Sequence, residues 1–154
     1  MPLTTRYVAV VGPGESASAE DIAGAQEVGR LLAQAGAIVL TGGLGGVMAA
    51  ATDGANAAGG TTVALLPGTD RSVSSATVVI PTGLGELRNG LLVRAADAII
   101  AVGGSWGTLS EIALAMRTDV PVVCLGGWDV RDATGAPHVL RRADSPADAV
   151  ASVL

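Results

Sequence analysis

The sequence contains no lysine and no phenylalanine, and it has one cysteine and one histidine among its 154 residues. Without lysine the chain has neither the Schiff-base residue of pyridoxal phosphate enzymes nor the GK[ST] lysine of a P-loop. Cys124 has no partner for an intramolecular disulfide, and together with His138 it is too little to build a zinc site within one chain. We therefore expect no metal site and no bound cofactor.

Charged residues are also scarce, at 15%, and the 14 acidic side chains outnumber nine arginines, so that the formal net charge is −5. An acidic chain repels the phosphate backbone of nucleic acids, which argues against a nucleic-acid partner. No apolar run reaches the roughly 18 residues of a membrane span, and the first residues lack the pattern of a signal peptide. We expect one domain over residues 1–154, cytoplasmic and without a membrane partner.

Short apolar runs alternate along the chain with alanine-rich stretches of helical length. The runs are continuously apolar, as in parallel strands that are covered on both faces. They predict strands at 7–11, 37–40, 62–66, 77–80, 98–102 and 120–125, and helices at 19–35, 47–58, 84–96, 108–117 and 145–154. This alternation is typical of an α/β fold with a mostly parallel sheet flanked by helices.

Glycine is abundant, with 22 residues, and it follows one predicted strand after another. The positions of interest are Gly12 and Gly14, then Gly42, Gly43 and Gly45, then Gly103, Gly104 and Gly107. At the carboxyl ends of parallel strands, glycine lets the backbone approach a ligand, and the next helix N-terminus favours an anion. The alternative is that glycine only makes tight turns. The first turn lacks the GxGxxG pattern and the second strand ends without an acidic residue, so the pattern disfavours NAD.

The most specific motif is GGSWGTLSE at 103–111. One interpretation is structural: Thr108 and Glu111 have the spacing of a capping box at a helix N-terminus. The other is functional: an anion binds the amides of Gly107 and Thr108, with Glu111 beside it as a base or as a stabiliser of a cationic sugar. Ser105 in the same turn is a further candidate to bind the ligand. Arg88, in the predicted helix 84–96, is the best basic candidate for an anionic ligand, unless it only pairs with a surface neighbour such as Glu86.

The segments TGGLGGVMAAATDGANAAGG (41–60), TVALLPG (62–68), LRN (87–89), ADAIIAVGGSWGTLSEI (96–112) and PVVCLGGWD (121–129) resemble the Lonely Guy (LOG) family, also called lysine decarboxylase-like. The resemblance implies a modified Rossmann fold and a homodimer in which the partner subunit completes each site. It also implies hydrolysis of the N-glycosidic bond of nucleoside 5′-monophosphates such as AMP. Carried over residue by residue, it assigns catalysis to Arg88 and Glu111, and phosphate binding to Gly103, Gly104, Gly107 and Thr108.

The chain departs from that family where the Met-His-x-Arg-Lys motif is replaced by GELRN at 85–89. Such departures are typical of a small-protein branch that also resembles molybdenum-cofactor carrier proteins, which bind a phosphorylated pterin without converting it. Two functions therefore stay open. The first is a nucleoside 5′-monophosphate phosphoribohydrolase, and the alternative is a non-catalytic carrier or sensor of a phosphorylated heterocycle. For the hydrolase, Trp106 or Trp128 is a candidate to stack on the base, and the alternative is that a tryptophan beside a glycine-rich turn only covers the core.

Overall fold

The computed structural model describes residues 4–137 and 140–154, so His138 lies outside the described residues. Its centre is one sheet of seven strands in the order β4-β3-β2-β1-β5-β6-β7, and every neighbouring pair is parallel. The strands are β1 (Tyr7–Val11), β2 (Ile38–Thr41), β3 (Thr62–Leu66), β4 (Val78–Pro81), β5 (Ala98–Val102), β6 (Val122–Leu125) and β7 (Arg141–Arg142). The predicted α/β class and parallel sheet are confirmed.

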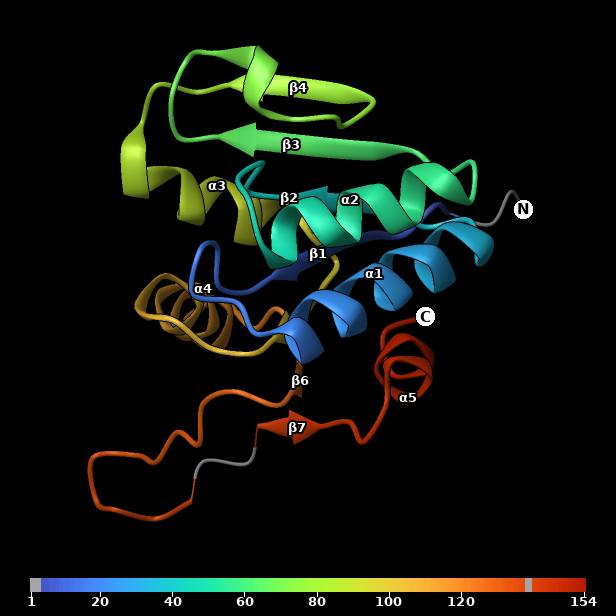
Figure 1. The fold of residues 1–154 in the computed structure, drawn as a ribbon. Helices are drawn as coiled ribbons and strands as arrows, with labels where there is room; N and C mark the ends of the chain where they lie inside the picture. The colour runs from blue at the N-terminus through green and yellow to red at the C-terminus, as the bar shows by residue number, and fades with distance from the viewer. Residues whose placement is uncertain (1–3, 138–139) are drawn as a thin grey trace.

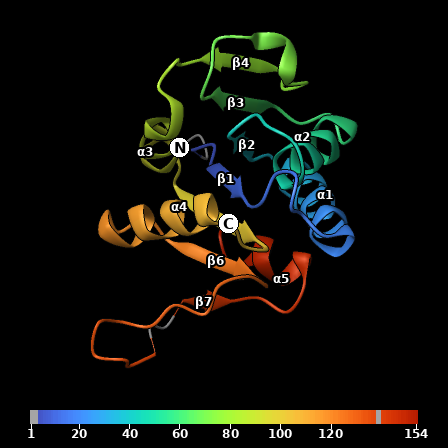
Figure 2. The same ribbon diagram turned by 60° about the vertical axis from the view of Figure 1, so that its left-hand side comes forward.

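Five α-helices cover the two faces of this sheet among the described residues. They are α1 (Ala19–Gln34), α2 (Val47–Ala57), α3 (Arg88–Ala95), α4 (Trp106–Arg117) and α5 (Pro146–Ala151), with short 3-10 helices η1 (Arg71–Val73) and η2 (Gly85–Leu87). Helices α1, α2 and α5 lie on one face and α3 and α4 on the other (Figure 2), and an apolar cluster fills each interface. No helix in the described part of the chain is long and apolar enough to cross a membrane.

Strand β7 was not predicted from the sequence, and the α-helix within the predicted range 84–96 is shorter than expected. Strand β7 consists of two arginines that pair with β6, so the sequence has no apolar run there that would predict a strand. Ahead of α3, Gly83 and Gly85 adopt φ values of 66° and 58°, a left-handed conformation that an α-helix does not contain. The α-helix therefore begins only at Arg88, which places this side chain in the first turn of α3.

The chain order creates a crevice beside the first strand. From β1 the chain proceeds through β2 and β3 to β4 at one edge (Figure 1). It then returns to place β5 on the other side of β1. In open parallel sheets, ligands bind at such a switch point, outside the carboxyl ends of the strands. The turns after β1, β2 and β5 all open on this crevice.

Candidate functional site

A cavity of about 360 Å³ lies at the carboxyl ends of the central strands. We call it the strand-end cavity. Its volume is at the lower end of the range typical of small-molecule sites, about 300–1,000 Å³. The turns after β1 and β2, the helix α2, the segment from η2 into α3, and the N-terminal half of α4 form its walls, with these residues: Val10, Val11, Gly12, Gly14, Gly42, Leu44, Met48, Pro67, Gly85, Glu86, Arg88, Asn89, Ser105, Gly107, Thr108 and Glu111.

Most of the residues expected from the sequence meet in this cavity. Both expected catalytic residues line it, and so do these expected binding residues: Gly12, Gly14, Gly42, Ser105, Gly107 and Thr108. Gly43, Gly45, Gly103 and Gly104 do not line it. Gly103 has φ +67°, and a Cβ there would lie 2.7 Å from Asp21 Oδ2, so this glycine is required by the turn and by helix α1.

Arg88 reaches into the cavity from the first turn of α3 and is 6% exposed. Its guanidinium lies against the turn after β2: a Cβ built on Gly42 would be only 2.2 Å from Arg88 Nη1. A side chain at this position would therefore displace the guanidinium. The Nε–H of Arg88 is buried and has no hydrogen-bond partner among the described residues. A buried donor without an acceptor is costly, by about 1–3 kcal/mol. A ligand that offers an acceptor here would remove that cost.

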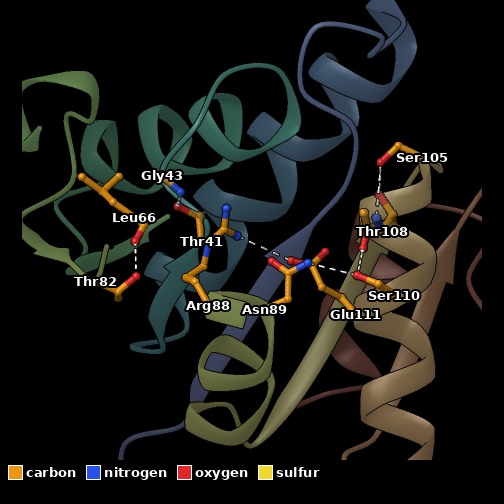
Figure 3. A network of polar contacts seen from close by, with 11 residues as sticks. Thr41, Gly43, Leu66, Thr82, Arg88, Asn89, Ser105, Thr108, Ser110 and Glu111 are labelled. Atoms are coloured by element: carbon orange, nitrogen blue, oxygen red, sulfur yellow. Dashed lines mark hydrogen bonds and ion pairs between the residues drawn. The ribbon is translucent and has the colours of Figure 1, made fainter. Parts of the chain in front are cut away.

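Glu111, on α4, is the counter-ion of Arg88 in the described structure. Its Oε1 lies 3.8 Å from Arg88 Nη1, an ion pair beyond hydrogen-bonding distance (Figure 3). Glu111 is itself 6% exposed, and burial raises its pKa to about 7, while the positive charge of Arg88 limits the rise. Burial also lowers the pKa of Arg88 from its ordinary value. The carboxyl group is therefore able to exchange a proton near neutral pH.

Two structural alternatives from the sequence are wrong. The N-cap of α4 is Ser105, three residues before Thr108, and its Oγ accepts a hydrogen bond from Thr108 N at 3.3 Å. Glu111 lies in the second turn of this helix, too far along to cap it. Arg88 does not pair with Glu86, since its ion pair is with the buried Glu111.

The N-terminus of α4 adds backbone donors to the cavity. With Ser105 as the N-cap, the first amides of the helix, those of Trp106 and Gly107, have no acceptor within the helix. The aligned peptide dipoles place about half a positive charge at this end. Helix α4 has 12 residues and faces the same cavity as the Arg88 guanidinium. Together these groups form a site suited to a phosphate.

The sequence interpretation missed several wall residues. Met48 comes from the first turn of α2, and Asn89 follows Arg88, where its Nδ2 donates to Ser110 Oγ at 3.0 Å (Figure 3). That bond links α3 to α4 beside the Arg88–Glu111 pair. The signal in the sequence was the LRN segment at 87–89, which places Asn89 next to Arg88. Among residues 4–137 and 140–154, no group of three His, Cys, Asp or Glu side chains is placed to hold a metal ion.

The two tryptophans contact each other beside the cavity rather than lining it. Their ring centroids are 5.0 Å apart with an angle of 45° between planes, and Trp128 Nε1 donates to Ser105 O at 2.9 Å. Trp128 therefore supports the turn that caps α4. Trp106 is 78% exposed. Cys124 is buried in β6, and burial raises the pKa of its thiol.

This chain matches a known protein family and is similar to several solved structures. The pattern of the SLOG cluster4 family matches residues 5–150. An uncharacterized protein of Archaeoglobus fulgidus is 42% identical over 119 residues, which cover 77% of this chain and 78% of that protein.

Two similar solved structures cover nearly the whole chain. The molybdenum cofactor binding protein of the phototrophic bacterium Rippkaea orientalis is 34% identical with a TM-score of 0.86, over 98% of this chain and 96% of that one. The Moco carrier protein of Chlamydomonas reinhardtii is 36% identical with a TM-score of 0.84, over 97% of this chain and 95% of that one. The similarity to this group expected from the sequence is confirmed.

Proposed function

The chain belongs to the SLOG cluster4 family, and on this basis we propose that it binds a phosphorylated heterocycle in the strand-end cavity and carries it without converting it. The observation that carries the proposal is Arg88, whose buried Nε–H has no described partner and whose side chain lines the same cavity as the N-terminus of α4. Both groups donate hydrogen bonds to an anion, and neither converts the ligand. A phosphorylated pterin such as the molybdenum cofactor is the ligand class we favour, because one similar protein, 34% identical, is described as a molybdenum cofactor binding protein and another, 36% identical, as a Moco carrier protein.

In this proposal the phosphate accepts hydrogen bonds from the amides of Trp106 and Gly107 and from Arg88. Arg88 then exchanges part of its pairing with Glu111 for contact with the phosphate. The neighbouring side chain of Asn89 holds α3 against α4 through Ser110, so that the donors keep their relative positions. Fixed donors of this kind reduce the entropy lost when the ligand binds.

A second candidate function is the phosphoribohydrolase, and the position of Glu111 favours it. The carboxyl group lines the cavity and has a pKa of about 7, near the optimum for transferring a proton at neutral pH. In this reaction water adds to C1′ of the ribose while the bond from C1′ to the base nitrogen breaks. The electron pair of that bond leaves with the base, which takes up a proton. Glu111 would activate the water or stabilise the cationic sugar.

One experiment separates the two functions. Purified protein is incubated with AMP and other nucleoside 5′-monophosphates, and chromatography measures the release of free base. In parallel, native mass spectrometry measures retention of a phosphorylated pterin. The carrier function predicts no free base, one ligand bound per chain, and nearly unchanged binding in Glu111→Gln. Release of base that disappears in Glu111→Gln would instead establish the hydrolase.

We also propose a homodimer, as the LOG resemblance implies. Leu87 is 76% exposed and Trp106 is 78% exposed, and both adjoin residues that line the strand-end cavity. Large exposed apolar side chains beside a site are typical of an interaction surface. Light scattering after size exclusion tests this: a dimer mass is expected, with dissociation in Leu87→Arg. A monomer at high protein concentration would contradict it.

A further inference from the structure

A second cavity, of about 290 Å³, adjoins the strand-end cavity. Leu44, in the turn after β2, lines both cavities and is 42% exposed. The second cavity lies between that turn, helix α2 and the segment that begins with η1. We call it the Asp53 cavity; it is lined by Gly43, Leu44, Ala49, Thr52, Asp53, Ser72, Val73, Ser74 and Ser75. Gly43, expected from the sequence to contact a ligand, lies here rather than in the strand-end cavity.

The wall opposite α2 is held in place by hydrogen bonds to that helix. Asn56 Nδ2 donates to Ser75 O at 2.9 Å, and Ser75 Oγ donates to Asp53 Oδ1 at 3.2 Å. Asp70 Oδ1 accepts from both the backbone N–H and the Oγ–H of Ser72. These contacts tie a loop of hydroxyl side chains to α2, so the shape of the cavity is defined before any ligand enters.

Asp53 is the only charged residue among the described walls of this cavity, and no ion pair joins it to a described arginine. An ionised carboxylate is an acceptor with room for about four hydrogen bonds, and the described contacts of Asp53 include one, from Ser75. The side chain therefore suits a ligand edge that presents two adjacent N–H donors, because such an edge binds a carboxylate through two parallel hydrogen bonds.

We propose that the Asp53 cavity recognises a 2-amino-4-oxopyrimidine ring, the ring that pterins and guanine share, through its ring N–H and 2-amino group. The inference rests on the proposed function: the phosphate occupies the strand-end cavity, and the ring passes over Leu44 into the Asp53 cavity. Adenine offers a ring-nitrogen acceptor at the equivalent edge, which a carboxylate repels. The Asp53 cavity thus selects against AMP.

The test is a calorimetric titration with a pterin monophosphate, GMP, AMP and ribose 5-phosphate. Wild-type protein is expected to bind the pterin monophosphate at least about tenfold more tightly than AMP, the ratio expected from a charge-assisted pair of hydrogen bonds. Asp53→Asn is expected to bring this ratio close to one and to leave the affinity for ribose 5-phosphate unchanged. Asp119→Asn is the matched control, since Asp119 is exposed and lies just before β6, outside both cavities.

Each outcome decides the proposal. A pterin monophosphate that binds more tightly than GMP identifies the pterin as the source of the ring, and the reverse order identifies guanine; either supports the Asp53 cavity. The Asp53 proposal is overturned if AMP binds as tightly as the pterin monophosphate and GMP, or if the preference over AMP persists in Asp53→Asn. In that case, binding of ribose 5-phosphate leaves the proposed function intact. If ribose 5-phosphate also fails to bind, the phosphate site is wrong and both proposals fall.

Discussion

Arg88 and Glu111 lie on two different helices of the same face of the sheet, and their charged groups come within 3.8 Å of each other in the wall of one cavity. Both residues are 6% exposed. The distance exceeds that of a hydrogen bond, so the guanidinium keeps donor capacity for a ligand. Glu111 acts as the counter-ion of Arg88, and an incoming anion can take the place of Glu111 in this pair.

The first prediction concerns pH and stability. The pKa of Glu111 rises from 4.5 to about 7 on folding, so the folded chain binds this proton more tightly than the unfolded chain. Stability should therefore fall as the pH rises from about 4.5 to 7, by up to roughly 3 kcal/mol, and level off above that range. Urea unfolding at several pH values measures it.

Glu111→Gln should remove this contribution, so the wild-type minus variant difference isolates it from other titrating groups. Glu86→Gln, which changes an exposed carboxylate at the same cavity, should leave the pH profile unaltered. A difference between wild type and Glu111→Gln that does not vary with pH contradicts the assigned pKa.

The second prediction concerns Arg88. Arg88→Met keeps an unbranched chain of similar length but removes the charge and all donors. Ligand affinity should fall about 10–100-fold, as expected when hydrogen bonds to a charged group are lost. Arg94→Met, at the exposed C-terminal end of the same helix, should bind as the wild type does. Equal losses in both variants would mean that α3 contributes only its overall charge.

The third prediction tests the close approach of the turn after β2 to the guanidinium. A methyl group on Gly42 would lie 2.2 Å from Arg88 Nη1, the mobile end of a flexible side chain. Gly42→Ala should therefore fold but displace Arg88 and weaken ligand binding about tenfold, the equivalent of one lost charge-assisted hydrogen bond. Gly45→Ala is the matched control, since a Cβ there meets nothing within 4 Å. Wild-type affinity in Gly42→Ala would show that Arg88 has room to move without cost.

The fourth prediction separates the cap of α4 from the charge of the site. Ser105→Ala should destabilise the protein by about 1 kcal/mol, because Thr108 N loses the side-chain acceptor of the N-cap. Ser105→Asp should restore thermal stability but weaken phosphate binding, because a carboxylate then lines the cavity. Thermal unfolding and calorimetry measure the two effects. Retained phosphate affinity in Ser105→Asp would place the anion elsewhere.

Local sequence patterns were enough to predict the fold class and to point to the edge of the sheet where the candidate site lies. The apolar runs predicted six of the strands to within about two residues, and Ser145 and Pro146 begin α5 as their preferences for N-cap and N1 indicate. The glycines after β1, β2 and β5 pointed to the edge of the sheet where the strand-end cavity lies. Such signals are readable because they depend on neighbouring residues in the chain.

Tertiary structure alone decided which of these residues meet and what surrounds them. The spacing of Thr108 and Glu111 fits a capping box as well as a site, and only the packing of α3 against α4 gives Glu111 a buried arginine as its partner. Strand β7 exists because β6 offers an edge to pair with, and the Asp53 cavity exists because the segment after η1 is hydrogen-bonded to α2 through Ser75. Burial and long-range pairing arise between segments far apart in sequence, so no local pattern encodes them.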